Sequence, residues 1–453
     1  MFKWWFSIPL WARVLMAMAA GVAVGYGLQH ALIAFGLHIG VAPDEAKAVA
    51  ANWIKTYLGP FGDLFVRLLR MLIVPLVLTT LVAGIVALGD PKKLGSIGLK
   101  TISLYFITTI FANIIGIIFG ILFQPGRDVN LSDAEAKAVS TETASLSERL
   151  LSIVPQNPVQ ALVDGDILAI IFFSILLGIG IIMAGKSAKV LGDVFTAASE
   201  AVLKVTEIVM EFAPIGVFAL VSYTVASQGL DALMSIAVLI GCVYAGLIVH
   251  MILVYGGIIK FLLRLPVRRF FTGISDAQAV AYSTASSNAT LPVTISNLTE
   301  KLGVKPAIAG SVLPLGATIN MDGTSLYLGI LALFAAQVFG YDLGLAEYAI
   351  IAMTAAVVSV GTAGIPSASL FLLAIVLQTF GTTPEQVALI VGFILPVDRI
   401  MDMARTTVNV TGDAAVAVAV AKWEGELDED IYYGRKAYDA PPEDLDDLYR
   451  PNS

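Results

Sequence analysis

The sequence predicts an all-α protein that crosses a membrane many times. Its 453 residues are 57% hydrophobic and only 14% charged, whereas a soluble domain carries about 25% charged residues. So few charges cannot cover a water-facing surface of this size, so lipid must cover much of it. Long apolar segments recur along the chain, and some are broken by small polar residues. The single cysteine, Cys242, excludes an intrachain disulfide.

The charges and histidines exclude other classes. Residues 423–453 contain ten acids and three bases, which account for most of the net charge of −8. We expect this segment to be a solvated, mobile tail in the cytoplasm. The absence of a dense Lys/Arg run disfavours nucleic-acid binding. His30, His38 and His250 are scattered and lack the spacing of metal ligands.

Eight helices are expected to span the membrane. The predicted spans are 14–36, 61–88, 97–123, 167–185, 190–223, 232–262, 304–339 and 386–422. Most reach the roughly 20 residues that a spanning helix needs. Lysines and arginines cluster in alternate connections, and the positive-inside rule then places both termini in the cytoplasm.

Two further apolar segments, 270–300 and 345–380, are broken in the middle, at 283–290 and 361–367. Each half is too short to span alone, so the segments are expected to be re-entrant hairpins that enter from opposite faces. Each is followed by a long helix, which makes the second half an inverted repeat. Paired interrupted segments point to a transporter binding site. Ordinary helices with Gly/Ser kinks remain the alternative.

Charged residues follow one face of the 386–422 helix. At 100° per residue, Asp398, Asp402, Arg405, Asn409 and Asp413 fall within a stripe of roughly 80°. Because charges at membrane depth are costly, this stripe must face protein or a cavity and is a functional candidate. Internal ion pairs, such as Asp402 with Arg405, are the structural alternative.

The 304–339 helix has its own polar break at 316–324, where an asparagine and Asp322 lie among glycines and threonines. Carbonyl, amide and carboxylate oxygens suit a small hard cation, and a plain kink is the alternative. Asp322, Asp402 and Asp413 against Arg405 leave a charge of −2, which favours cations. An arginine that can bind a carboxylate, beside an acid that can bind an ammonium, predicts a small amphoteric acid as cargo.

Four motifs resemble the signature of the glutamate transporter family, the dicarboxylate/amino acid:cation symporters. They are PLGATINMDGT at 314–324, SS and TLP within 286–292, GTAGIP at 361–366 and DMARTTVNVTGD at 402–413. The run APIGVFAL at 213–220 resembles the fifth helix of this family. The motifs occur in order, and the resemblance covers residues 10–425.

The resemblance implies an elevator-type homotrimer in the bacterial inner membrane, in contact with lipids. Scaffold helices one and two would lie in 1–96, and an outer loop with helices four and five in 126–230. The transport domain would comprise helix three in 97–125 and residues 231–422, followed by the tail 423–453.

The resemblance also assigns site residues. Arg405 would bind the side-chain carboxylate of the substrate and Asp402 its ammonium. The other substrate-binding residues would be Ser286, Ser287, Thr324, Ile365, Ser369, Thr406 and Asn409. Sodium would bind at Gly316, Asn320, Asn409 and Asp413, at Thr318, Ser359 and Thr362, and at Tyr105, Thr108, Thr109, Asn320 and Asp322.

Two departures from the family pattern concern charge and flexibility. Family members usually carry a further arginine where this chain has Ala285 or Met403, so the electrostatics around Asp402 differ. The second hairpin has Ser-Ala-Ser at 367–369 where glycines are common, which predicts a stiffer lid.

We therefore expect sodium-coupled uptake of L-aspartate or L-glutamate, with sodium as a co-transported ion. The alternative is a C4-dicarboxylate symporter coupled to sodium or protons, although a dicarboxylate would leave Asp402 facing a carboxylate. An intramembrane aspartyl protease would need Asp322 and Asp402 to share a proton, yet Arg405 should keep Asp402 ionised. Two closing hairpins argue against a channel.

Overall fold

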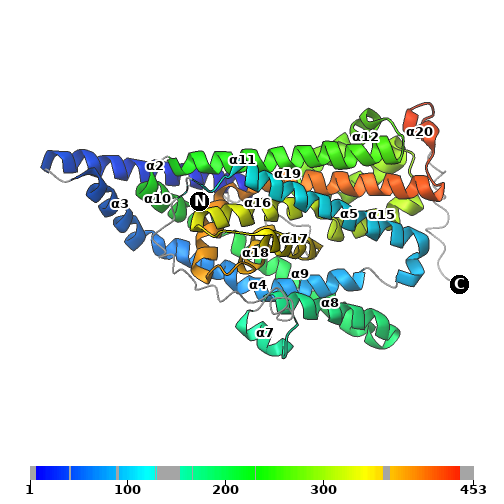
Figure 1. Cartoon of the computed structure of the whole chain (residues 1–453), viewed down its shortest axis with the longest axis horizontal. Coiled ribbons are helices and arrows are strands. Elements are labelled where there is room, and N and C mark those ends of the chain that lie inside the picture. Colours follow the sequence, from blue (N-terminus) through cyan, green and yellow to red (C-terminus); the bar gives the residue numbers. More distant parts are fainter. Residues whose placement is uncertain are drawn as a thin grey trace.

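The computed structural model describes residues 7–39, 42–87, 91–127, 129, 154–165, 167–229, 231–360 and 368–438. Within these ranges the chain is helical, and its β pairing is limited to one isolated antiparallel bridge between Val304 and Leu427. Most of the long helices run roughly along a common direction (Figure 1). The all-α prediction is confirmed.

One group of helices comes from the N-terminal half of the chain. Its members are α2 (Leu10–Ile39), α3 (Pro43–Tyr57), α4 (Gly59–Ala87), α7 (Pro158–Asp164), α8 (Ile167–Ala184), η1 (Gly185–Ala188), α9 (Lys189–Met210) and α10 (Ala213–Gln228). α10 packs along α2, and α4 packs along α8 and α9. A Cβ atom on Gly21 would lie 2.9 Å from the carbonyl oxygen of Phe218, so α2 and α10 meet backbone to backbone.

The second group contains α5 and nearly everything after residue 230. Its members are α5 (Pro91–Phe123), α11 (Asp231–His250) with the π-helical turns η2 (Met251–Tyr255) and η3 (Ile258–Leu262), α12 (Val267–Gly273), α13 (Ser275–Thr284), α14 (Ser287–Ser296), η4 (Asn297–Lys301), α15 (Pro306–Ile319), α16 (Asp322–Phe339), α17 (Leu345–Val360), α18 (Ala368–Gln378), α19 (Pro384–Glu424) and α20 (Glu429–Tyr433). α16 contacts α5, α17, α18 and α19, and α13 and α15 pack on α19.

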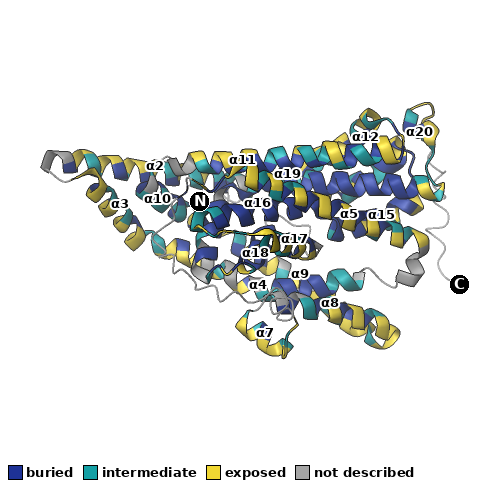
Figure 2. Cartoon of the chain, in the orientation of Figure 1, coloured by how far each residue is buried: buried dark blue, intermediate teal, exposed yellow. Residues whose placement is uncertain are grey.

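α16 and α19 form the centre of the second group. Figure 2 shows both helices largely in the buried colour, whereas α2 and α3 carry many exposed residues. In the 18-residue apolar part of Pro306–Phe339, 83% of the residues are buried, whereas only 17% are buried in the corresponding part of Ala12–Gly36. The most enclosed helices are therefore the two in which sequence analysis placed the functional residues.

Within the described residues, five stretches are long and apolar enough to cross a membrane. They are Ala12–Gly36, Ser96–Phe123, Phe172–Met210, Met234–Leu262 and Pro306–Phe339. Val74–Val86, Ala213–Ser227 and Leu345–Ser359 are shorter apolar helices. α19 is absent from both sets because its buried charges lower its hydropathy, so eight spanning helices remains a prediction.

Two predicted boundaries differ from the structure. The predicted span 190–223 is divided into α9 and α10 by a turn at Glu211 and Phe212, with Pro214 in the first turn of α10, where proline needs no N–H partner. The connection 37–60, between the first two predicted spans, contains α3, a polar helix that a search for apolar segments does not detect. α3 buries Ala46, Ala50 and Ile54, which lie on one face at four-residue spacing.

The first predicted hairpin is present, with a shorter break than expected. α13 ends at Thr284, Ala285 adopts a left-handed conformation with φ 51°, and the Ser286 side chain accepts a hydrogen bond from the Ala289 amide at 3.2 Å. This N-cap restarts the helix at once. In the second hairpin, α17 and α18 flank 361–367, the predicted break, which lies outside the described residues.

The start of the acidic tail is packed rather than solvated. The backbone of Asp428 donates to Gly303 at 2.8 Å, Lys305 pairs with Glu426 at 2.5 Å, and Lys100 pairs with Glu424 at 2.8 Å. Tyr432 is fully buried. The expectation of a mobile tail is therefore wrong for residues 424–436, here called the C-terminal clasp, and residues 439–453 lie outside the described ranges.

Candidate functional site

The break between α15 and α16 positions a cluster of oxygen-bearing side chains. Asn320 (φ −88°, ψ 82°) and Met321 (φ −111°, ψ 50°) leave the helical conformation, and Asp322 begins α16. α5 and α19 supply the facing side chains. The polar cluster consists of Tyr105, Thr108, Thr109, Gly316, Asn320, Asp322, Asn409 and Asp413. Gly316 is buried, and the other seven are at most 4% exposed.

Asp322 and Asp413 receive several hydrogen bonds within the polar cluster. The Thr109 hydroxyl donates to Asp322 Oδ1 at 2.6 Å, and the Tyr255 hydroxyl donates to Asp322 Oδ2 at 2.8 Å. The Asn320 amide donates to Asp413 Oδ1 at 3.0 Å. Asn409 Oδ1 accepts from the Gly323 backbone at 2.8 Å, which ties α19 to the first turn of α16.

The two carboxylates lack a basic partner of the lysine or arginine type in the described part of the chain. His250 Nε2 lies 3.4 Å from Asp322 Oδ2, and neither ring nitrogen of this buried histidine has a hydrogen-bond partner among the described residues. Burying two carboxylates without compensating positive charge is costly. The polar cluster therefore has the electrostatics of a cation site.

The donor atoms suit a hard ion. Among the described residues, no three His, Cys, Asp or Glu side chains gather as a transition-metal site would require. The polar cluster instead offers carboxylate, amide, hydroxyl and backbone oxygens. The carbonyl of Gly316, a predicted ligand, accepts from the backbone N–H of Asn320 at 2.9 Å, and a carbonyl oxygen has a second lone pair available.

The charged stripe on α19 faces protein, as predicted. Asp398, Asp402, Arg405, Asn409 and Asp413 are at most 4% exposed. The guanidinium of Arg405 donates to Asp402 at 2.7 Å and to Asp398 at 3.3 Å. The internal ion pair that sequence analysis kept as the structural alternative is therefore present.

Tyr327 completes this arginine cluster of Tyr327, Asp398, Asp402 and Arg405. Its ring centroid lies 4.0 Å from the guanidinium carbon of Arg405, within the range of a cation–π contact, and its hydroxyl donates to Asp398 at 2.6 Å. Nε of Arg405 is buried and has no hydrogen-bond partner in the described ranges. One donor of a rigidly held guanidinium thus stays available.

A second arginine lies between the first hairpin and Asp402. One Arg399 nitrogen donates to the carbonyl of Thr284 at 2.9 Å, and the other lies 3.9 Å from Asp402 Oδ2. Thr284 directly precedes Ala285, one of the two positions where family members usually carry the extra arginine. Arg399 thus brings a positive charge to the region from a different position.

The remaining predicted substrate residues are mostly buried. Ser287, Thr324, Ser369 and Thr406 are at most 5% exposed, and the Ser369 hydroxyl lacks a partner within the described residues. Ser286 is half-buried and caps α14. Thr324 lies next to Gly323, whose Cβ position would be 2.5 Å from the Arg405 carbonyl. Ile365 lies outside the described residues.

The predicted sodium sites differ in how far the structure assembles them. The residues of the first and third come together in the polar cluster. In the second, the Thr318 and Ser359 hydroxyls each donate to a carbonyl of their own helix, at 3.0 and 2.8 Å. Thr362 lies outside the described residues, so that site stays a prediction.

Three side chains at the site, Tyr255, His250 and Tyr327, are not predicted from the sequence. His250 was set aside for lack of metal-ligand spacing, yet an ionisable residue in the apolar segment 232–262 was itself the signal. The two tyrosines carry no comparable signal, because aromatic residues are common in apolar helices.

Comparisons with known proteins show the family to which the chain belongs. A family model described as the sodium:dicarboxylate symporter family matches residues 10–423. The chain is 40% identical over 380 residues to a proton/sodium-glutamate symport protein of Bacillus subtilis, covering 82% of this chain and 87% of the relative. It is 36% identical over 428 residues to a proton/glutamate-aspartate symporter of Escherichia coli, covering 92% and 93%.

A C4-dicarboxylate transport protein of Rhodospirillum rubrum is 33% identical over 431 residues, covering 93% of this chain and 90% of the relative. Both substrate classes considered from the sequence thus occur among the relatives. With nearly the whole chain matched, this protein belongs to the sodium:dicarboxylate symporter family and is a multi-pass membrane transporter rather than an enzyme.

Proposed function

We propose that this chain couples inward sodium flux to the uptake of an acidic amino acid, L-aspartate or L-glutamate. The observation that carries the proposal is the separation of charges in the buried site. The arginine cluster offers a guanidinium with a free Nε next to Asp402, while the polar cluster holds two carboxylates without a lysine or arginine partner.

An acidic amino acid exchanges with the Asp402–Arg405 pair at little electrostatic cost. Its side-chain carboxylate takes the place of Asp402 on the guanidinium, and its ammonium takes the place of the guanidinium on Asp402. Asp398 and Tyr327 keep holding Arg405 during this exchange. Ser286, Ser287, Thr324, Ile365, Ser369, Thr406 and Asn409 complete the proposed substrate site.

Sodium is proposed at the polar cluster, where its charge would offset Asp322 and Asp413. One ion would use Gly316, Asn320, Asn409 and Asp413, and another Tyr105, Thr108, Thr109, Asn320 and Asp322. The second hairpin would contribute a further site of Thr318, Ser359 and Thr362. Each set consists of oxygen donors, the ligands that hard cations prefer.

The packing supports an elevator mechanism. The helices of each group pack chiefly on one another, and the groups meet where α18 and α19 contact α2, α4 and α10. In Figure 1, α2 and α3 project at one end of the molecule, and α12 and α20 lie at the other. We propose that the first group is the scaffold of a homotrimer in the bacterial inner membrane, with eight spanning helices, two hairpins and both termini cytoplasmic.

A C4-dicarboxylate is the second candidate, and Arg399 is the observation that favours it. Its guanidinium lies 3.9 Å from Asp402. This positive charge reduces the repulsion between Asp402 and a second substrate carboxylate. The relatives named as C4-dicarboxylate transport proteins match over a similar share of the chain.

Reconstitution in liposomes tests both candidates. Labelled L-aspartate should accumulate under an inward sodium gradient, and replacement of sodium by choline should abolish the uptake. Uptake that continues unchanged in choline would contradict the sodium assignment. Succinate that outcompetes aspartate would identify the dicarboxylate as the substrate.

A further inference from the structure

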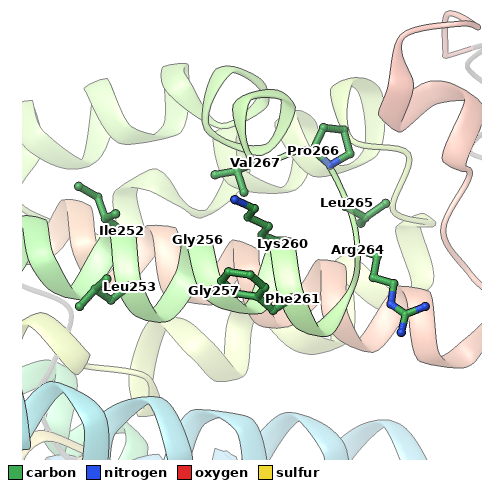
Figure 3. Close-up of a pocket in the computed structure, with 10 residues that line it drawn as sticks. All are labelled: Ile252, Leu253, Gly256, Gly257, Lys260, Phe261, Arg264, Leu265, Pro266 and Val267. Carbon is green, nitrogen blue, oxygen red and sulfur yellow. The ribbon is translucent and has the colours of Figure 1, made fainter.

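A groove of about 760 Å³ lies beside η2 and η3, the π-helical turns that continue α11, and reaches the start of α12 (Figure 3). The α11 groove is lined by Ile252, Leu253, Gly257, Lys260, Phe261 and Arg264, among others. Glycine keeps it open, because a Cβ atom on Gly257 would meet no atom within 4 Å. The substrate site proposed above uses none of these residues.

The floor of the α11 groove is hydrocarbon that the protein leaves uncovered. Ile252, Leu253 and Phe261 are 60%, 65% and 75% exposed. All three belong to Met234–Leu262, a segment apolar enough to cross a membrane. Lipid chains therefore reach this floor without any rearrangement of the helix.

The end of the same groove is cationic. Lys260 and Arg264 are exposed, neither forms an ion pair within the described residues, and no acidic side chain is among the lining residues. Figure 3 shows the Lys260 side chain extending toward Val267 on α12, across the groove. Arg268 and Arg269 lie in the first turn of α12, so the connection between η3 and α12 is a basic segment of the kind found at the membrane surface.

We propose that the α11 groove binds an anionic phospholipid, with its phosphate at Lys260 and Arg264 and its acyl chains over the apolar floor. An apolar floor that ends in unpaired cations matches the two parts of this molecule. A symmetric contact with a second copy of the chain is disfavoured, because it would bring two such cationic ends together. The groove thus selects lipids by headgroup charge.

The charge arm of the test uses the full chain purified in detergent. Native mass spectrometry counts bound phosphatidylglycerol and, separately, phosphatidylcholine with the same acyl chains. Each basic residue should contribute about fivefold, so Lys260→Gln/Arg264→Gln should weaken phosphatidylglycerol binding about 25-fold and leave phosphatidylcholine binding unaffected. The matched control, Lys186→Gln/Lys189→Gln, removes two exposed lysines elsewhere and should change neither.

A second set of variants fills the groove with a side chain instead of removing its positive charges. Gly257→Leu should displace the lipid, whereas Gly241→Leu, on the same segment and also without an atom within 4 Å of its Cβ position, should not. Glycerol phosphate that binds as tightly as the lipid would overturn the proposal in favour of a simple anion site. Equal retention of both lipids, unchanged binding in Lys260→Gln/Arg264→Gln, or dimers that Gly257→Leu dissociates would also overturn it. None of these readouts depends on transport.

Discussion

Replacement of Gly316 by alanine should block the polar cluster with a single methyl group. The added Cβ would lie 2.5 Å from the Tyr105 hydroxyl and 2.6 Å from Asp413 Cγ, and closer still to Asp413 Oδ1. Ordinary contact begins at 3.4 Å, so these groups would have to move apart by nearly 1 Å. Overpacking of this kind costs about 1–3 kcal/mol.

Sodium binding would have to reverse that displacement, because the moved atoms are the proposed ligands. The same 1–3 kcal/mol corresponds to a rise of roughly 5- to 150-fold in the sodium concentration for half-maximal uptake. The measurement is a sodium titration of labelled L-aspartate uptake in proteoliposomes. Gly310→Ala is the matched control, since it lies on the same helix and its Cβ position has no neighbour within 4 Å.

The melting temperature in detergent, measured once with sodium and once with choline, distinguishes a misfolded variant from one whose sodium site is blocked. Gly316→Ala should fold but lose the stabilisation that sodium gives the parent. Gly412→Ala approaches the polar cluster from α19, since its Cβ would lie 2.5 Å from the Tyr255 hydroxyl and 2.6 Å from the Asn320 amide, and it should behave alike. A half-saturating sodium concentration within twofold of Gly310→Ala in both variants would refute the placement of the ion.

Three further predictions concern the charges. Arg405→Cys should abolish uptake of acidic substrates and admit neutral amino acids, and an unaltered affinity for aspartate would contradict its role. Arg399→Gln removes a charge 3.9 Å from Asp402, an interaction on the order of 4 kcal/mol at a dielectric constant of about 20. Inhibition by succinate should therefore weaken at least tenfold more than inhibition by aspartate, and parallel changes would refute this. Hydrogen bonds from Lys100 and Ser96 lower the pKa of Glu424 below its usual 4.5. The ion pair between Glu424 and Lys100 therefore stabilises the folded chain above pH 4.5, and this stabilisation is lost as the pH falls through the lowered pKa. The melting temperature should therefore fall less on acidification from about pH 5 to pH 3 in Glu424→Gln than in the parent, and equal slopes would contradict the clasp contact.

Much of the second half was predictable because its signals are local. A helix repeats every 3.6 residues, so the positions of Asp398 to Asp413 alone placed them on one face. A break in a hydrophobic run likewise showed where α15 gives way to α16. The predicted break in the first hairpin, 283–290, is longer than the observed one, because Ser286 caps α14 and the helix resumes at Ser287.

The rest depends on contacts between segments far apart in the chain. Nothing near Tyr327 in sequence shows that its ring meets Arg405, since that contact follows from the packing of α16 on α19. Arg399 is not part of the predicted stripe, and its partner Thr284 is 115 residues away. The packing of the C-terminal clasp could not be predicted from its composition. A run of acids is typical of a solvated tail, and the sequence does not show that lysines elsewhere in the chain bind it.

The charge of −2 that was predicted for the site as a whole can be assigned to particular side chains in the structure. Asp398 and Arg399, which the sequence-based sum left out, add one charge of each sign, and Asp398 and Asp402 together are balanced by Arg399 and Arg405. The remaining negative charge lies on Asp322 and Asp413, the two carboxylates of the polar cluster. The clusters meet at the first turn of α16, where the Gly323 amide binds Asn409 and a Cβ at Gly323 would lie 2.5 Å from the Arg405 carbonyl. A cation that reorders this turn must therefore act on the backbone that carries Arg405, which gives sodium and substrate a common structural element.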